Sequence, residues 1–126
     1  MSGLLIDTNV AVWLLLGKRE AVTGAAREQL EDEHNMVMVS AVSVWEIAIK
    51  RSLGKLQIED RWAQELTRLG FDPLPVNARH AERVEHLPWQ HRDPFDRLLI
   101  AQALVDGLTL VSADGRLAEY GVTVLW

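Results

Sequence analysis

Four acidic residues of this 126-residue chain stand at comparable places relative to its predicted strands and helices. Asp7 directly follows the apolar run "LLI", and Asp114 stands just behind "LTLVS". Glu46 and Asp96 fall in the first turns of two predicted helices. In an open parallel sheet, ligands bind in the crevice beyond the carboxyl ends of the strands. We therefore expect the four carboxylates to converge at one edge of a sheet.

A cluster of carboxylates repels itself unless cations or protons neutralise it. Hard divalent ions such as Mg²⁺ and Mn²⁺ take oxygen ligands and are the natural companions of such a cluster. An ion held in this way can activate a water molecule and stabilise charge that develops on a phosphoryl oxygen. The leading interpretation is therefore hydrolysis of a phosphodiester.

Each acid taken alone also has an ordinary structural explanation. Asp7 could simply cap the following helix. Glu46 could form an ion pair with Lys50 one turn later, and Asp114 could be a turn residue that supports Gly115. These explanations are independent of one another, whereas a site requires several acids at the same edge. The joint pattern favours a site.

The elements that must position these acids alternate along the chain. Short apolar runs rich in branched residues are followed by longer segments of helical period, a pattern typical of an α/β fold with a parallel sheet. Strands are predicted at 3–6, 36–40, 108–111 and 122–126, with a short extended segment or edge strand at 71–76. Helices are predicted at 10–16, 21–33, 43–53, 60–68, 77–85 and 93–105, with one short helix after 115. Asp93 is the expected N-cap of the helix that carries Asp96, and Pro94 its first residue.

Composition limits the classes of function. The chain has the length of one ordinary domain, and its 48% hydrophobic and 25% charged residues are typical of a globular protein. It has no cysteine, which excludes disulfides, thiolate nucleophiles and cysteine zinc sites and makes the cytoplasm the expected location. The N-terminal apolar run is interrupted at residues 7–9 and lacks a leading basic region, so we expect neither a signal peptide nor a membrane span.

The formal net charge of −5 argues mildly against a protein that binds nucleic acid by neutralising many phosphates. The negative charge is compatible with nucleic-acid binding through a bridging metal ion. The most basic part of the chain is residues 79–97, which could form a rim for RNA, a contact for an acidic partner, or only a solvated helix face. Its basic residues are Arg79, His80, Arg83, His86, His91, Arg92 and Arg97.

Four segments, "LLIDTNV", "SAVSVWEIAIKRSLGKL", "HRDPFDRLLIAQA" and "LTLVSADGRL", occur in this order at suitable spacing. Together they resemble the PIN-domain ribonucleases and, within them, the VapC-type toxins of bacterial toxin–antitoxin pairs. The resemblance covers essentially the whole chain. It implies a single PIN domain over residues 1–126, with a three-layer α/β fold in which helices flank a central, mainly parallel β-sheet.

The resemblance also implies roles for individual residues. Asp7, Glu46, Asp96 and Asp114 match the catalytic, metal-binding acids of the family. Asp93 matches an additional acid near the third of these, and we assign the metal to Asp96 because Asp93 already has a capping role. Asn9 and Ser112 match polar positions that support the first and fourth acids; many relatives have Thr in place of Ser112, which keeps the hydroxyl.

For the protein as a whole, the resemblance implies an endoribonuclease that depends on Mg²⁺, for which Mn²⁺ can substitute. It implies a homodimer and a cognate VapB-type antitoxin that inserts a C-terminal segment into the acidic groove. The residues we expect to contact RNA or the antitoxin are Lys50, Arg92, Arg97 and Trp89, the last by stacking on a base. The spacing of the histidines matches no zinc-binding pattern, so transition-metal ligation by histidine is the weaker interpretation.

The same residues fit two alternative functions. Asp7 could be a phosphate-accepting nucleophile, as in haloacid-dehalogenase-like phosphatases or receiver-like domains. Such phosphatases usually place a second Asp two residues later, where this chain has Asn9. The protein could also be a non-catalytic PIN module that only binds another protein. The presence of all four acids argues against a non-catalytic module, because a protein that binds no metal has little reason to keep four mutually repelling carboxylates.

Overall fold

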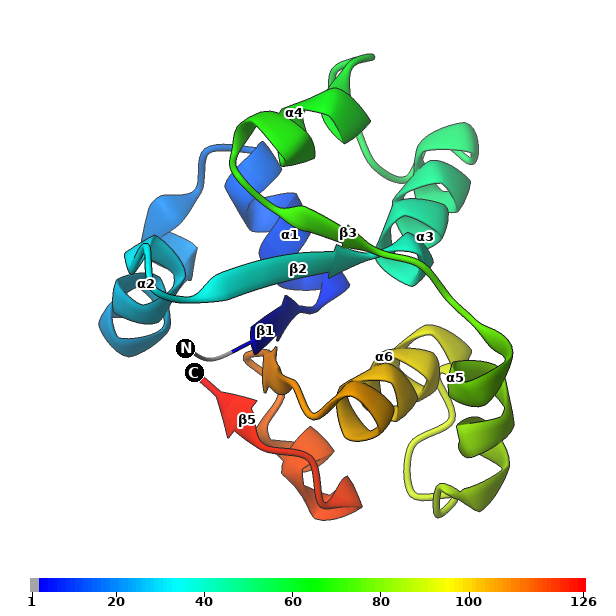
Figure 1. Ribbon diagram of the computed structural model, residues 1–126. Coiled ribbons are helices and arrows are strands. Elements are labelled where there is room, and N and C mark those ends of the chain that lie inside the picture. The colour runs from blue at the N-terminus through cyan, green and yellow to red at the C-terminus, as the bar shows by residue number, and fades with distance from the viewer. Residues whose placement is uncertain (1–2) are drawn as a thin grey trace.

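The computed structural model describes residues 3–126, which form a parallel sheet with helices on both of its faces (Figure 1). The strands are β1 (Gly3–Ile6), β2 (Met36–Ser40), β3 (Asp72–Leu74), β4 (Thr109–Val111) and β5 (Val124–Leu125). Their order in the sheet is β3-β2-β1-β4-β5, and every neighbouring pair is parallel. The predicted α/β fold with a central parallel sheet is confirmed.

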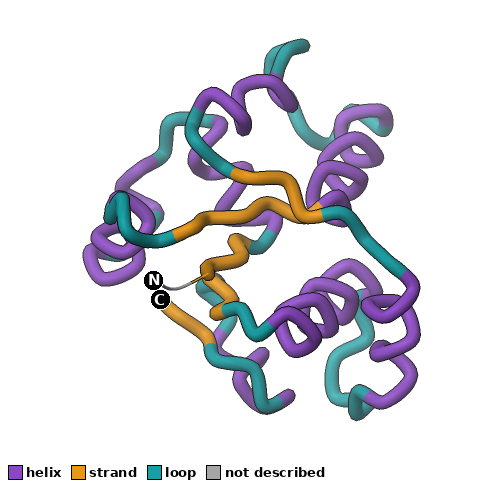
Figure 2. The backbone as a smooth tube through the Cα atoms, viewed as in Figure 1, coloured by secondary structure: helices purple, strands orange, loops and turns teal. Residues whose placement is uncertain are grey.

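Helices alternate with the strands along the chain, and Figure 2 shows the helices in purple around the orange strands. The α-helices are α1 (Thr8–Leu15), α2 (Gly24–Glu31), α3 (Ala41–Ser52), α4 (Trp62–Arg68), α5 (Ala78–Arg83) and α6 (Pro94–Asp106). Three 3₁₀ turns complete the described chain: η1 (Arg19–Ala21), η2 (Val84–His86) and η3 (Gly115–Tyr120). None of the described helices is long and apolar enough to cross a membrane.

The three layers arise from the alternation of side chains along the central strands. Leu4 and Ile6 of β1 lie in one core cluster with residues of α1, α2 and α4, whereas Leu5 lies in a second cluster with residues of α6. Successive side chains of a strand point to opposite faces, so β1 contributes to both cores. Leu5 and Ile6 are fully buried, and each such side chain contributes about 1.5–3 kcal/mol to the free energy of unfolding.

Capping moves two helix starts away from their predicted positions. The first helix begins at Thr8 instead of residue 10, because Asp7 is the N-cap and its Oδ1 accepts a hydrogen bond from the Val10 N–H at 2.9 Å. The helix predicted from residue 43 begins at Ala41, because the Oγ of Ser40 accepts a hydrogen bond from the Val42 N–H at 3.0 Å. Polar residues at strand ends therefore serve directly as N-caps.

Two predicted helices are shorter than expected, and the extended segment forms an edge strand. The helix predicted at 21–33 is divided into η1 and α2, with Thr23 as the N-cap of α2. The helix predicted at 77–85 ends as the 3₁₀ turn η2. Strand β3 contains Pro73 and lies at one edge of the sheet, where a residue without an N–H is tolerated.

The carboxyl ends of β1 and β4 are joined directly at the edge of the sheet where Asp7 stands. The N–H of Asp7 donates a hydrogen bond to the carbonyl oxygen of Val111 at 3.0 Å. Ser112 directly follows β4, and its N–H donates a hydrogen bond to the carbonyl oxygen of Leu125 in β5 at 3.2 Å. Because these strand ends are fixed by backbone bonds, the residues that follow them occupy defined positions.

Candidate metal centre

Asp7 is a buried carboxyl at the end of the central strand. Its exposed fraction is 6%, and the Val10 N–H holds one of its oxygens. Burial raises the pKa of Asp7 to about 6, against the hydrogen bonds from Ser112 and Val10, and the negative charges of Asp96 and Glu46 raise it further. An ionised carboxylate here costs folding free energy unless a cation compensates it.

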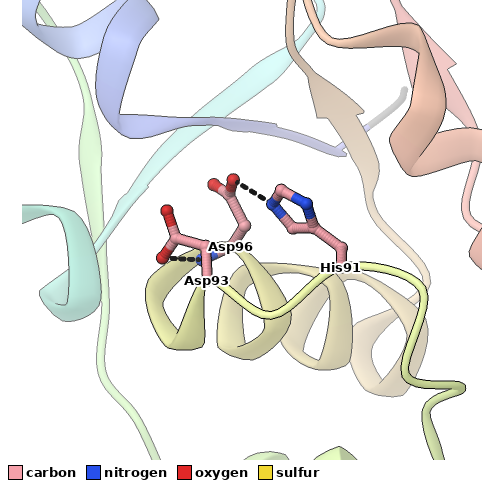
Figure 3. Close-up of side chains that lie close together, drawn as sticks. All are labelled: His91, Asp93 and Asp96. Carbon is pink, nitrogen blue, oxygen red and sulfur yellow. Dashed lines mark hydrogen bonds and ion pairs between the residues drawn. The ribbon is translucent and has the colours of Figure 1, made fainter.

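Asp93 and Asp96 lie together at the start of α6, as Figure 3 shows. The Oδ1 of Asp93 accepts hydrogen bonds from the N–H groups of Phe95 at 2.9 Å and Asp96 at 3.4 Å, so the predicted capping role is confirmed. The carboxylate of Asp96 points toward the ring of His91, and the distance from Asp96 Oδ2 to His91 Nε2 is 2.8 Å. Burial raises the pKa of Asp96, while the hydrogen bond from His91 lowers it.

Glu46 forms the ion pair that its position in the sequence suggested and lies near two other acids. It is 8% exposed and lies in the second turn of α3, because the helix begins earlier than predicted. The Nζ of Lys50 is 2.9 Å from its Oε2, so the ion pair one turn away is present. The charge of Glu46 also acts on both Asp7 and Asp96. The structure therefore places Asp7, Glu46 and Asp96 near enough for the charge of each to act on its neighbours.

Asp114 is at the rim and is already paired. It is the N-cap of η3, and both of its carboxylate oxygens accept hydrogen bonds from the guanidinium of Arg116, at 2.9 and 2.8 Å. This pairing with Arg116 lowers the pKa of Asp114. Its side chain is 28% exposed. The predicted turn role of Asp114 is thus also present, and Arg116 is a neighbour that the sequence did not point to.

Of the two predicted supporting residues, Ser112 contacts the acids and Asn9 does not. The Oγ of Ser112 accepts a hydrogen bond from the Asp114 N–H at 3.0 Å, and the interaction with Ser112 lowers the pKa of Asp7. Asn9 is exposed on α1 and makes no side-chain hydrogen bond to the described acids. The supporting role of Asn9 therefore stays a prediction.

A buried hydroxyl pair that sequence reasoning missed links α1 to α3. The Oγ1 of Thr8 donates a hydrogen bond to the Oγ of Ser43 at 3.0 Å. Both side chains are buried, with exposed fractions of 4% and 0%. The pair fixes the helix that carries Glu46 against the residue next to Asp7. The available signal was a small polar residue next to apolar ones in each helix, with Ser43 between Val42 and Val44.

The basic segment 79–97 is not a continuous rim. Arg97 is only 2% exposed, and its guanidinium donates hydrogen bonds to the carbonyl oxygens of four residues. The expectation that Arg97 contacts RNA or a partner was therefore wrong, because the guanidinium is enclosed by the loop before α6. His80 is also buried and pairs with Asp106 at 3.0 Å. Arg92 is exposed, and so is Trp89, at 72%.

Within the described chain, the side chains of His91, Asp93 and Asp96 form a group whose ligand atoms all lie within 4.8 Å of one another. The donor set is therefore carboxylate oxygen with one imidazole nitrogen, next to the buried carboxyl of Asp7. Such a set fits a divalent cation. A bound cation would also offset the repulsion that the neighbouring acids exert on Asp7.

Comparisons with solved structures reveal the same fold in several toxin–antitoxin complexes. VapBC2 from Rickettsia felis, solved with a DNA fragment from its promoter, has a TM-score of 0.73 at 14% identity and covers 97% of this chain and 96% of its own. VapBC from Salmonella typhimurium, solved bound to DNA, has a TM-score of 0.70 at 17% identity, with 98% and 97% covered. A toxin–antitoxin complex from Klebsiella pneumoniae has a TM-score of 0.68 at 22% identity, with 97% and 95% covered.

Comparison with curated proteins found no match. The sequence model of the PIN domain matches residues 4–122, from the first residues of β1 to the segment before β5. This match includes every acid of the candidate centre. By this match over nearly its whole length, the chain belongs to the PIN domain family.

Proposed function

We propose that this protein is a divalent-metal-dependent endoribonuclease of the VapC toxin type. The observation that carries the proposal is the buried carboxyl of Asp7 at the carboxyl edge of a parallel sheet, with Glu46 and Asp96 close enough to act on its charge. Ligand sites of open α/β sheets lie at this edge. The PIN family match supports a nuclease reaction at this place.

In this proposal, Asp7, Glu46, Asp96 and Asp114 hold Mg²⁺ or Mn²⁺. The bound ion supplies a water molecule activated for attack and stabilises the charge on the phosphodiester oxygens. The protein's own part is to fix the carboxylates. The backbone N–H of Val10 holds Asp7, and the capping of α6 by Asp93 holds the turn that carries Asp96.

Two further contacts determine how the acids can act. The Nζ of Lys50 lies 2.9 Å from the Oε2 of Glu46 and compensates part of its negative charge. Arg116 holds both oxygens of Asp114, so Asp114 contributes to the centre only when Arg116 releases it. A released Arg116 would be a cation at the rim, where a phosphate of the substrate could accept its hydrogen bonds.

The proposal is tested by cleavage of a mixed RNA pool with purified full-length protein, with and without a chelator. We expect cleavage in the presence of Mn²⁺ or Mg²⁺, loss of cleavage on chelation, and a decrease of at least about a hundredfold for Asp7→Asn, because loss of a ligand removes transition-state stabilisation of several kcal/mol. Asp72→Asn, on the exposed edge of β3, is the matched control. A folded protein that is inert on all RNA pools with Mn²⁺ present would overturn the proposal.

We also propose a cognate VapB-type antitoxin as partner, a homodimer as the assembly, and the cytoplasm as the place of action. Support for the antitoxin comes from structures of this fold that are VapBC or toxin–antitoxin complexes. A cationic antitoxin side chain inserted among Asp7, Glu46 and Asp96 would compensate their charge in place of the metal. Lys50, Arg92 and Trp89 remain the proposed contacts to RNA or antitoxin.

Co-expression with a small gene adjacent to that of the toxin tests the partner proposal. We expect the two chains to co-purify and the complex to lose RNA cleavage. Size-exclusion chromatography with light scattering then measures the assembly of the separated toxin. Cleavage that continues unchanged in a stable complex would contradict an antitoxin that acts at the acidic centre.

A further inference from the structure

His91 is the one of the chain's four histidines whose ring contacts the acidic centre. His34 and His86 have side chains 92% and 67% exposed, and His80 is buried against Asp106 at the other end of α6. The side chain of His91 is 22% exposed, and its Nε2 is directed at Asp96 (Figure 3).

The backbone of His91 is anchored from two other elements. Its carbonyl oxygen accepts a hydrogen bond from the buried guanidinium of Arg97 in α6 at 3.2 Å. The same oxygen accepts one from the hydroxyl of Tyr120, at the end of η3, at 3.5 Å. The imidazole therefore projects from a fixed point of the loop, so its approach to Asp96 is determined by the fold.

The spacing of the two side chains is that of neighbouring metal ligands. An octahedral ion with ligands at about 2.1 Å holds adjacent ligand atoms about 3 Å apart. The distance from His91 Nε2 to Asp96 Oδ2 is 2.8 Å, and a ligand atom of Asp93 lies within 4.8 Å of both. In the metal-free protein this contact is a hydrogen bond. When the ion binds, a proton on Nε2 leaves to solvent and the neutral ring keeps its proton on Nδ1, so that Nε2 and Oδ2 can take adjacent coordination positions with little movement.

We propose that His91 is a direct nitrogen ligand of the metal, next to Asp96, and that it makes the centre select a first-row transition ion over Mg²⁺. The inference rests on the proposed metal-dependent function and deepens it by adding a ligand and a selectivity. Mg²⁺ prefers oxygen ligands and near-ideal octahedral geometry, whereas transition ions gain from an imidazole nitrogen. A centre of carboxylates alone has no comparable reason to discriminate.

A purely positioning role for His91 makes different predictions. If the imidazole only orients Asp96 by a hydrogen bond, its loss weakens Mg²⁺ and Mn²⁺ to a similar degree, and no nitrogen is bonded to the ion. If it is a ligand, its loss weakens Mn²⁺ selectively. The two roles are therefore separable by metal binding alone, without RNA.

The decisive experiment is pulsed electron paramagnetic resonance of Mn²⁺ bound to the full-length protein after chelator treatment. We expect a directly bonded nitrogen coupling in the wild type that changes to the ¹⁵N pattern when only histidine is labelled with ¹⁵N. The coupling should disappear in His91→Gln and persist in His86→Gln, the matched control on an exposed histidine. The labelled wild type keeps the test valid even if His91→Gln fails to fold.

Calorimetric titrations give the second readout. For His91→Gln we expect the Mn²⁺ affinity to fall about tenfold or more, the range typical of changes around metal ligands, while the Mg²⁺ affinity changes far less. Wild-type Mn²⁺ without nitrogen coupling, or equal weakening of both ions, overturns the inference. RNA cleavage with Mn²⁺ but without nitrogen coupling would overturn the inference and leave the proposed function standing. Nitrogen coupling in a protein that is inert on RNA would support His91 as a ligand and overturn the proposed ribonuclease function.

Discussion

Arg116 occupies both carboxylate oxygens of Asp114, with its Nε at 2.9 Å from one and a terminal nitrogen at 2.8 Å from the other. The guanidinium thus stands where a divalent ion would bind if Asp114 is a ligand. An internal cation and the metal compete for the same acid.

Arg116→Gln should therefore bind Mn²⁺ more tightly than the wild type. Because the pair is exposed and screened by solvent, the gain should be about twofold to fivefold. Isothermal titration measures it. Arg68→Gln is the control, since Arg68 pairs with Glu65 through a similarly exposed contact on α4. An unchanged Mn²⁺ affinity in Arg116→Gln would contradict a role of Asp114 as a ligand.

Asp7→Asn should stabilise the metal-free protein as the pH rises. The pKa of Asp7 is about 6 in the folded protein and 3.8 as the ordinary value, so the folded state binds more protons between these values. Its contribution to stability is complete below about pH 4 and is lost as the pH rises through about 6. At pH 7 the loss amounts to roughly 2–3 kcal/mol, which Asn avoids while keeping a capping oxygen.

Thermal or urea unfolding of the two proteins in chelator, from pH 4 to pH 8, measures this difference. The stability of Asp7→Asn relative to the wild type should grow across the interval from about 4 to 6 and then level off. Asp72→Asn, with its exposed side chain on β3, controls for the loss of one negative charge. A difference that does not depend on pH would refute the electrostatic explanation.

Addition of Mn²⁺ should stabilise the wild type more at pH 7.5 than at pH 5. Protons and the metal compete for Asp7 and Asp96, whose pKa values burial raises. At a free concentration about a hundred times the dissociation constant, binding adds about 2.7 kcal/mol to the free energy of unfolding. Melting curves of the wild type and Asp7→Asn at both pH values test this. Equal shifts for the two proteins would place the metal away from Asp7.

Removing both hydroxyls of the Thr8–Ser43 pair should lower the free energy of unfolding by less than the sum of the two single removals. Thr8→Val leaves the buried hydroxyl of Ser43 without its 3.0 Å partner, at a cost of about 1–3 kcal/mol. In the double variant with Ser43→Ala, no hydroxyl is left unpaired. Urea unfolding of the two single variants and the double variant gives the coupling. Strict additivity would mean that the bond contributes nothing specific.

Substitution by Gln should lower stability at Arg97 and lower binding at Arg92. Arg97→Gln leaves several buried carbonyl oxygens without their donor, so we expect a loss of at least about 2 kcal/mol in stability. Arg92→Gln, at an exposed position, should change stability by less than about 0.5 kcal/mol. Its effect should instead be weaker binding of RNA or antitoxin. Unfolding curves and binding titrations of both variants distinguish the structural arginine from the surface one.

The sheet and the position of Asp7 at the end of β1 could be predicted from the sequence because both depend on local order. Apolar runs of branched residues are strands, and the residue after a parallel strand, such as Asp7, stands at the ligand edge of the sheet. The helix start at Ala41 was missed because Ser40 ends β2 and also caps α3, a dual role that hydrophobic periodicity does not reveal. The start at Thr8 was placed two residues late because the apolar pattern begins at Val10, although capping by Asp7 was one of the alternatives.

The sequence pattern did not predict which side chains meet across loops. Arg97 looks like a surface cation in the sequence, and only the course of residues 84–91 encloses it. His91 sits in a segment without periodicity, so nothing indicated that its ring would meet Asp96. Contacts of this kind depend on how a loop folds back over a helix, which short-range spacing does not encode.

The two borders of the sheet restrict how copies of this protein can associate. On one side β3 has three residues, one of them Pro73, which cannot donate a backbone hydrogen bond. On the other side β5 has two residues. Neither border offers enough unpaired backbone to template an incoming strand. Intermolecular β-pairing, the usual route from an exposed sheet to fibrous aggregates, is thus blocked at both ends, and self-assembly must use the helical surfaces.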